Sequence, residues 1–285
     1  MKTGWLIVAI FIIFQIQHAQ ERVTYSFTLD PIDIVIPCHK KDSRTLELVV
    51  NGIKQHLDYR RIIIVSSEQL LEDATVEWFD EKEYPFDMYD IIYEIFFDEE
   101  KARDYIDRPK SRAGWIYQQF LKLYASYVIP DISNNILIVD ADTIFFKPVV
   151  FQNGCGAPLF NVSDEVHPPY LVFMRQLIPG LKRAYPQFSG ITHHMLFQRC
   201  VLDDLFATIE KNHNMEPWRA ICQNVDKKAL GHSCMSEYEL YFNFLLNRSG
   251  QPKIRKLNWN NVPFRCFDQA KRGNLHYVSC HTYKG

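Results

Sequence analysis

The chain has 285 residues, of which 47% are hydrophobic and 14% aromatic, and its formal net charge is −2. This length and apolar content are enough for a substantial core in one large or two small domains, which excludes an intrinsically disordered chain. The near-neutral charge supplies no long-range attraction for nucleic acid or for an acidic membrane surface, so we expect no nucleic-acid partner.

The N-terminal residues have the pattern of a secretory signal. Lys2 provides a basic start, Trp5–Phe14 is an unbroken apolar run, and a polar boundary follows at 18–20. The apolar run is shorter than the about 20 residues that a bilayer span needs. We therefore predict a signal peptide at 1–20 and a protein of the secretory-pathway lumen or the cell exterior. An uncleaved signal anchor is the alternative, and only that alternative would attach the protein to a membrane.

Two glycosylation sequons and seven cysteines agree with an oxidising compartment. The sequons make Asn161 and Asn247 candidate glycosylation sites. The cysteines show no C-x-x-C spacing, which favours one or more disulfides and at least one free thiol over a structural zinc site. Cys38, which ends the first predicted strand, is our candidate for the free thiol.

A βαβ pattern opens the predicted domain. Ile32–Pro37 is an apolar strand, the apolar positions of Leu46–Leu57 follow helical spacing, and Arg61–Val65 is again a strand. Such units form parallel sheets and place their first loop at the ligand-binding edge. We predict a further strand at Tyr89–Phe97. Neither a Walker pattern nor G-x-G-x-x-G occurs, which argues against P-loop and dinucleotide-binding enzymes.

Arg112–Val128 is a predicted helix with one polar face. The residues of that face recur at i, i+3, i+4 and i+7 and are Trp115, Gln118, Gln119 and Lys122. The alternative is a helix whose glutamine and lysine side chains are simply exposed. Because the helix leads directly into the next strand, Arg112 and Lys122 are candidate partners for a diphosphate.

The central candidate site is an acidic pair at the end of a predicted buried strand. Ile136–Val139 is apolar and ends at Asp140-Ala141-Asp142, and Thr143–Phe146 then resumes an apolar run. Side chains alternate along an extended chain, so Asp140 and Asp142 point the same way and can reach one divalent cation. Two solvated aspartates in a surface turn are the alternative. Charges between two buried strands, however, need a cation or hydrogen bonds to offset their desolvation.

Further candidates lie in the second half of the chain. His193 and His194 are adjacent, so on a strand they point to opposite faces, and a surface or core histidine is the alternative for each. A capping box at the start of a predicted helix explains Glu239, whereas Glu237 could serve either the helix dipole or chemistry. His281 follows a short predicted strand and is either a metal ligand or an exposed terminal histidine.

Together these motifs resemble a glycosyltransferase of the GT-A fold. The resemblance is carried, in chain order, by IDIVIPCHKKD, RAGWIYQQFLKL, LIVDADTIFFKP, SGITHHMLF, SEYELY and SCHTYK. The resemblance covers about 32–284. Over this range the chain is similar to a group of glycosyltransferases known mainly from sequence, and more distantly to glycogenin-like enzymes. It implies one α/β domain at 24–285, with a mostly parallel central sheet flanked by helices and an elaborated C-terminal acceptor half.

The resemblance also implies a reaction. A sugar would pass from a nucleotide-sugar donor, expected to be a UDP-sugar, to a hydroxyl of a glycan, protein or lipid acceptor. The implied ligands of a Mn²⁺ or Mg²⁺ ion are Asp140, Asp142 and His281. Glu237 would be the catalytic base if the reaction inverts the anomeric centre, and His193 or His194 would line the acceptor pocket.

The implied donor-binding residues come from the first-strand loop, the polar helix face and the acidic motif: Pro37, His39, Lys40, Arg112, Trp115, Gln118, Gln119, Lys122 and Ala141. Rival interpretations remain open. A catalytically inactive, secreted carbohydrate-binding protein would keep the same fold. A nucleotidyltransferase would need a Gly-rich basic phosphate loop, which this sequence lacks. A metal-dependent hydrolase would need a denser cluster of histidine and aspartate ligands than this sequence contains.

Overall fold

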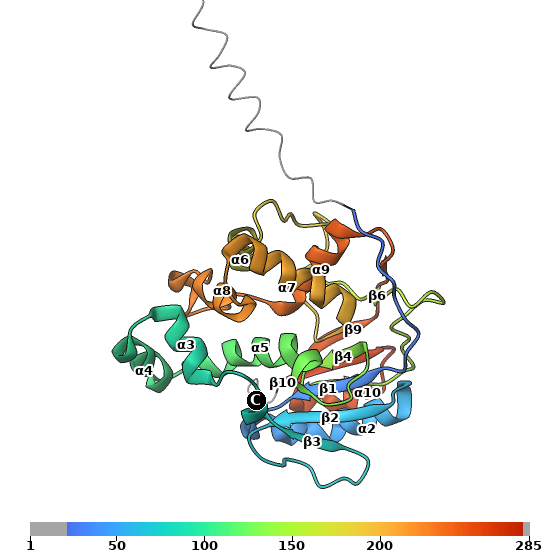
Figure 1. The fold of residues 1–285 in the computed structure, drawn as a ribbon. Coiled ribbons are helices and arrows are strands. Elements are labelled where there is room, and N and C mark those ends of the chain that lie inside the picture. The colour runs from blue at the N-terminus through green and yellow to red at the C-terminus, as the bar shows by residue number, and fades with distance from the viewer. Residues whose placement is uncertain (1–21, 282–285) are drawn as a thin grey trace, which may run out of the picture.

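The centre of the computed structural model, which describes residues 22–281, is a five-stranded sheet with the order β3-β2-β1-β4-β7 (Figure 1). Its strands are β1 (Asp33–Pro37), β2 (Arg61–Ser66), β3 (Glu77–Asp80), β4 (Asn135–Val139) and β7 (His194–Gln198). The strands β1 to β4 are parallel to one another, and β7 pairs antiparallel with β4. The predicted α/β class with a mostly parallel central sheet is thus confirmed.

Alternate residues of the strands face two separate cores. Val35 of β1 packs in the cluster that contains α5 (Ala113–Val128) and α9 (Glu237–Arg248). Ile34 and Ile36 pack on the opposite face, in the cluster that contains α2 (Leu46–His56). Helices therefore cover both faces of the sheet (Figure 1), which explains why its strands are apolar without alternation. The predicted β1-α2-β2 unit and the predicted helix α5 are confirmed.

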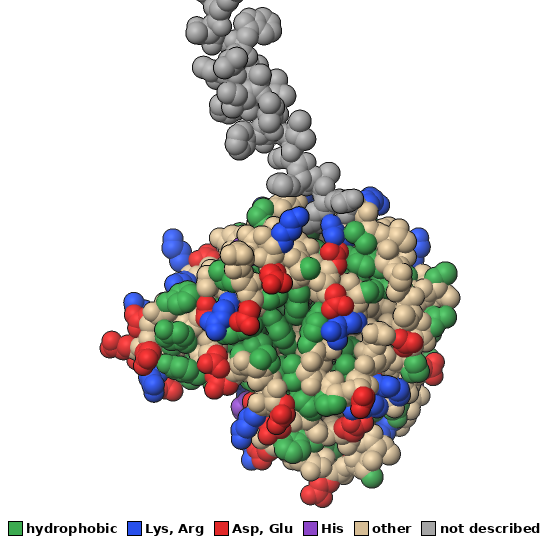
Figure 2. Space-filling model, in the orientation of Figure 1, with side chains coloured by type: hydrophobic (Ala, Val, Ile, Leu, Met, Phe, Trp, Pro, Cys, Tyr) green, Lys and Arg blue, Asp and Glu red, His purple; other side chains and the backbone are tan. Residues whose placement is uncertain are grey.

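The remaining helices surround this centre. They are α3 (Met88–Phe96), α4 (Glu99–Asp107), α6 (Pro168–Leu177), α7 (Arg199–His213), α8 (Pro217–Gln223) and α10 (Phe267–Lys271), with short 3-10 helices at Lys40–Thr45, Glu81–Glu83, Lys227–Ala229 and Phe264–Cys266. On the face shown in Figure 2, acidic and basic side chains are interspersed, in keeping with the small net charge.

Two smaller sheets extend the fold. The three-stranded one has the order β5-β10-β9, formed by β5 (Thr143–Phe145), β10 (Tyr277–His281) and β9 (Trp259–Pro263). The two-stranded one joins β6 (Leu159–Phe160) to β8 (Lys253–Ile254). Because β4 belongs to the large sheet and β5 to the three-stranded one, the acidic motif between them lies at the junction of two sheets.

The strand predicted at Tyr89–Phe97 is wrong, because this segment forms helix α3. Its buried residues Ile91, Ile92 and Ile95 follow helical spacing. Asp87 and Asp90 form a capping box, in which each side chain accepts a hydrogen bond from the backbone N–H of the other. The cap satisfies two N–H groups at the start of the helix, and this outweighs the strand preference of the isoleucine and aromatic residues.

The structure contains none of the predicted disulfides. All seven cysteines lie in the described part of the chain and are free, including Cys38. The predicted signal at 1–20 lies outside the described residues. Within 22–281, no helix combines the length and the apolar character that a membrane span requires.

The structure contradicts the predicted glycosylation of Asn161. This residue is only 4% exposed, and its amide nitrogen donates a hydrogen bond of 2.8 Å to the Tyr277 hydroxyl. Because the Asn161 side chain is packed against Tyr277 of the three-stranded sheet, a glycan on its amide nitrogen would have no room in the folded chain. The Asn247 amide donates to the carbonyls of Lys182 and Asn243, and its glycosylation stays a prediction.

Candidate metal centre

Asp140, Asp142 and His193 form a group that could hold a metal ion. One ligand atom from each lies within 4.8 Å of the others. Ligand atoms around one Mg²⁺ or Mn²⁺ lie about 3 to 4 Å apart, since each bond is about 2.1 Å, so small side-chain rotations would close the set. Two carboxylates and an imidazole suit a divalent cation of this kind.

The pairing of β4 with β7 places the histidine. The residue before β7 is His193, whose carbonyl accepts hydrogen bonds from the Asp140 N–H at 2.9 Å and the Thr143 hydroxyl at 3.1 Å. His193 Nδ1 lies 3.4 Å from Asp140 Oδ2. The predicted acidic pair is thus completed by a histidine that the sequence assigned to the acceptor pocket.

The predicted ligand His281 ends strand β10, and its side chain lies outside the described residues. The strand itself runs beside the motif, because the Cys280 N–H donates to the Asp142 carbonyl at 2.7 Å. The role of His281 as a ligand stays a prediction.

Lys122 of α5 is held between two carboxylates. Its Nζ lies 2.6 Å from Asp140 Oδ1 and 2.7 Å from Glu237 Oε1 at the start of α9. The Lys122 and Glu237 side chains are only 4% and 2% exposed. Tyr238 completes the arrangement, since its hydroxyl donates to Asp140 Oδ1 at 3.1 Å and its ring lies 4.4 Å from the ammonium. The predicted polar helix face therefore reaches the site through Lys122, as a buried ion pair.

Burial and charge act against each other on these pKa values. Burial alone would lower the pKa of Lys122, but Asp140 and Glu237 outweigh it and raise that pKa. Burial would likewise raise the pKa of Asp140, but Lys122 and His193 hold it below its usual range. Burial raises the pKa of Glu237 against the attraction of Lys122. For His193, the neighbouring Asp140 outweighs burial and raises the pKa. Lys122 and Asp140 are thus a charged pair at neutral pH.

Glu237 and Glu239 face different partners. Glu237 points to Lys122, so acting as a base on an acceptor hydroxyl would require it to release the ammonium, and that role stays a prediction. Glu239 does not close the predicted capping box. Ser236 accepts from the Glu239 N–H, but the Glu239 carboxylate accepts from the Gly190 N–H at 2.6 Å. This bond fixes the segment that leads to His193.

The loop after β1 lies beside α5 and the acidic motif. Gln118 Nε2 donates to the Pro37 carbonyl at 3.1 Å, and the Thr45 hydroxyl donates to the Ala141 carbonyl at 2.8 Å. His39 and Lys40 are exposed. The structure therefore brings the predicted donor residues Pro37, Gln118 and Ala141 into one neighbourhood.

Three other predicted donor residues are engaged along the first turns of α5. The Arg112 guanidinium lies 4.4 Å from the Trp115 ring and donates to the Ser233 hydroxyl. Gln119 is buried and donates to the Trp115 carbonyl within the helix. Gln119 therefore points into the core, and its predicted contact with a donor would require that bond to break.

His194 is separated from the site because it faces the other side of β7. It is 3% exposed and lies among the rings of Phe145, Phe151 and Tyr277, so it cannot line an acceptor pocket as placed. Neither ring nitrogen has a hydrogen-bond partner among the described residues. Burial lowers the pKa of His194 to about 3.

This buried histidine should make the fold sensitive to acid. A histidine with a folded pKa below its unfolded value of 6.5 is protonated first in the unfolded chain, so its contribution is full above about pH 6.5 and is lost as pH falls toward about 3. At pH 5 the loss is about 2 kcal/mol. The free energy of unfolding of the wild type should therefore fall between pH 7 and pH 5. In His194→Leu that fall should be smaller by about 2 kcal/mol, because the variant has no buried imidazole to protonate. Urea unfolding at both pH values measures this, and equal losses in the two proteins would contradict it.

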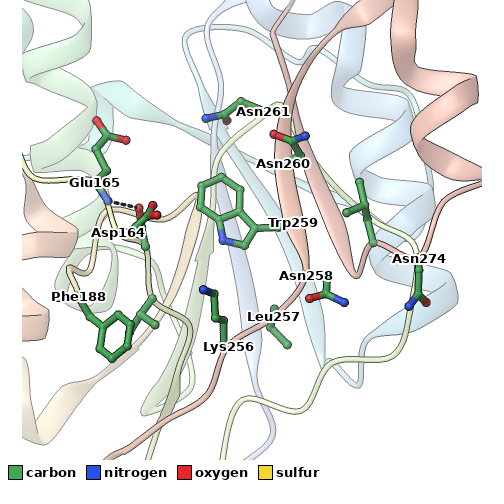
Figure 3. Close-up of a pocket in the computed structure, with 13 residues that line it drawn as sticks. Asp164, Glu165, Phe188, Lys256, Leu257, Asn258, Trp259, Asn260, Asn261 and Asn274 are labelled. Atoms are coloured by element: carbon green, nitrogen blue, oxygen red, sulfur yellow. Dashed lines mark hydrogen bonds between the residues drawn. The ribbon is translucent and has the colours of Figure 1, made fainter.

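Trp259 is a residue near the metal centre that the sequence analysis did not single out. Its ring lies 5.2 Å from the His193 ring, and it lines a cavity of about 550 Å³ next to the centre (Figure 3). The signal that could have found it is the run Asn258 to Asn261, in which an aromatic residue stands among amides.

The fold and the site define an α/β protein with a candidate divalent-metal centre at the carboxyl end of β4. The chain belongs to a family of unknown function, DUF6492, whose model matches residues 29–261. No curated protein matches the sequence.

Solved structures with similarity to this chain include glycosyltransferases, the class that the motifs resemble. Mouse xyloside xylosyltransferase 1, in its apo form, aligns at a TM-score of 0.43 and 13% identity, over 89% of this chain and 99% of that one. The galactosyltransferase LgtC, in complex with donor and acceptor sugar analogues, aligns at a TM-score of 0.41 and 12% identity, over 87% and 86%. Likenesses this low assign no activity to this chain.

Proposed function

We propose that the protein is a glycosyltransferase that moves a sugar from a nucleotide-sugar donor to an acceptor hydroxyl. The observation that carries the proposal is the grouping of Asp140, Asp142 and His193 within 4.8 Å at the end of a buried strand. The ordered motifs that resemble the GT-A fold support it. A UDP-sugar as donor and a place in the secretory lumen or outside the cell belong to the same proposal, and their support comes from the sequence.

In this proposal the three residues hold a divalent ion, which when bound offsets the negative charge of the departing nucleoside diphosphate. The protein's own contribution is to fix the ligands. Lys122 and Tyr238 hold Asp140 through two hydrogen bonds to the same oxygen. Glu237 in turn fixes the Lys122 ammonium. The lysine also limits the negative charge of the centre, which would otherwise repel a diphosphate.

One observation favours a second candidate, a carbohydrate-binding protein without catalysis. The Lys122 ammonium already compensates Asp140 at 2.6 Å, so this carboxylate needs no metal to be stable in the core. Such a protein would bind a saccharide but show no metal-dependent affinity for a nucleotide.

Titration calorimetry with UDP separates the two candidates. We expect UDP to bind in the presence of Mn²⁺ and to lose most of its affinity without it, with GDP binding more weakly. Asp142→Asn should weaken the metal-dependent binding by about 100-fold or more, since even groups that only orient metal ligands are worth about 10 to 100-fold.

The matched control is Asp98→Asn. Asp98 caps α4 away from the motif, and asparagine caps a helix as well as aspartate, so this variant should bind UDP as the wild type does. Binding that needs no metal, or that survives Asp142→Asn unchanged, would sink the proposal.

A further inference from the structure

The cavity beside Trp259 lies between the loop at 162–165 and strand β9 (Figure 3). In Figure 3 the indole stands between Asp164 and Glu165 on one side and Asn258 on the other. Four amide side chains contribute to its lining: Asn258, Asn260, Asn261 and Asn274. Nothing in the proposed metal centre accounts for such a concentration of amides.

These amides are suited to hydroxyl groups. Each asparagine offers a carbonyl acceptor and two N–H donors, and adjacent sugar hydroxyls need both kinds of partner. Among the described residues, the side-chain amides of Asn260 and Asn261 form no hydrogen bond, and both residues are exposed. Their polar atoms are therefore available to a ligand at the surface of the cavity.

Trp259 supplies a fixed apolar surface in the same wall. Its ring stacks on Tyr277, at 5.4 Å between centroids and an angle of 6°. The two residues are also register partners of the parallel strands β9 and β10, so both backbone and side chain are held in place. A rigid aromatic ring among a few polar groups is the usual composition of a site for a small amphipathic ligand, and the C–H face of a pyranose is such a partner.

The charge of the cavity argues against a second nucleotide site. Its charged lining residues are Asp164, Glu165 and Lys256. Two carboxylates and one ammonium give no net attraction for a diphosphate, which proteins usually hold with arginine, lysine or a helix N-terminus. An uncharged ligand is therefore favoured.

We propose that this cavity binds a neutral saccharide. Resting on the proposed function, we assign it as the acceptor site, because His193 connects the two places: its ring contacts Trp259, and its Nδ1 lies 3.4 Å from Asp140. An acceptor in the cavity would thus lie next to the metal centre. Of the two histidines predicted to line the acceptor pocket, this proposal keeps His193, which contacts Trp259, and not His194.

The test uses the whole protein and a panel of methyl α- and β-glycosides of glucose, galactose, mannose, xylose, fucose, N-acetylglucosamine and N-acetylgalactosamine. Saturation-transfer NMR detects binding, and tryptophan fluorescence gives the affinity. We expect at least one glycoside to bind. The double variant Asn260→Ala/Asn261→Ala should weaken it by about tenfold or more, the effect of losing one or two hydrogen bonds.

Asn51→Ala is the control, since Asn51 is an exposed asparagine on α2 outside the cavity. It should bind the glycoside as the wild type does. Trp259→Phe provides a second variant in the cavity wall, which keeps an aromatic ring against Tyr277 and reduces the surface offered to a sugar.

UDP titration with Mn²⁺ on the same variants keeps the two proposals distinguishable. Loss of glycoside binding with unchanged UDP binding in Asn260→Ala/Asn261→Ala supports an acceptor site. Glycoside binding in a protein that binds no UDP supports the saccharide site and refutes the transferase. Absence of binding across the panel, or binding that neither cavity variant weakens, overturns the inference.

Discussion

Replacing Lys122 with methionine should lower the free energy of unfolding by about 3 to 5 kcal/mol, because it leaves a buried carboxylate without its counter-charge. Glu237 depends on Lys122 most, since it is 2% exposed and lies 2.7 Å from the ammonium. Asp140 keeps His193 and Tyr238 as partners. Urea unfolding near pH 7, followed by circular dichroism, measures the loss.

Two further variants test whether the buried charge is the cause. Lys122→Met/Glu237→Gln should recover most of the stability, because both charges are then removed together. Lys54→Met removes a more exposed ion pair, with Asp73 at 2.5 Å and both side chains about a quarter exposed, and should cost less than about 1 kcal/mol. A Lys122→Met protein as stable as the wild type would contradict the burial of this pair.

Gly190→Ala should be the second damaging substitution, with a loss of about 1 to 3 kcal/mol from overpacking. A Cβ at Gly190 would lie 2.6 Å from Phe242 Cβ and 3.1 Å from the Tyr238 carbonyl, both on helix α9. The segment that carries His193 would have to move away from that helix. We therefore expect metal-dependent UDP binding to weaken in parallel with stability.

Gly114→Ala is the control for adding a methyl group. A Cβ there meets nothing within 4 Å, and the residue lies in helix α5, where alanine is favoured over glycine by up to about 1 kcal/mol. Thermal unfolding should show a melting temperature equal to or above that of the wild type. If Gly190→Ala also melts at the wild-type temperature, the close approach of α9 is not required.

The sequence predicts the parts of the fold that depend on local pattern. The strands β1, β2 and β4 are apolar runs bounded by polar turns, and the acidic pair follows β4 as expected. The expected extended chain through the pair is wrong, because Ala141 and Asp142 lie in a turn closed by the hydrogen bond from the Thr143 N–H to the Asp140 carbonyl. Helix α3 shows the limit of such prediction, because its isoleucine and tyrosine residues favour a strand, whereas a capping box of two aspartates at its start favours a helix.

The third member of the metal group depends on a long-range contact. His193 meets Asp140 because β7 pairs antiparallel with β4, with Val139 opposite His194. A shift of one residue in that register would exchange the faces of the two histidines, and no local pattern determines which one faces the acidic motif. The ion pair between Lys122 and Glu237 could not be predicted for the same reason, because the two residues are distant in the chain. The helix dipole also explains a glutamate at a helix start, so nothing local points to a lysine partner.

The junction of the two sheets has a consequence for the order of folding. The acidic motif is anchored on one side by β4, whose parallel partner β1 belongs to the early βαβ unit, and on the other by β5, which pairs with the distant strand β10. Loop-closure entropy makes contacts of such sequence separation slow to form. Both flanking pairings join residues far apart in the chain, so we expect the geometry of the acidic motif to form late in folding, after the local β1-α2-β2 unit.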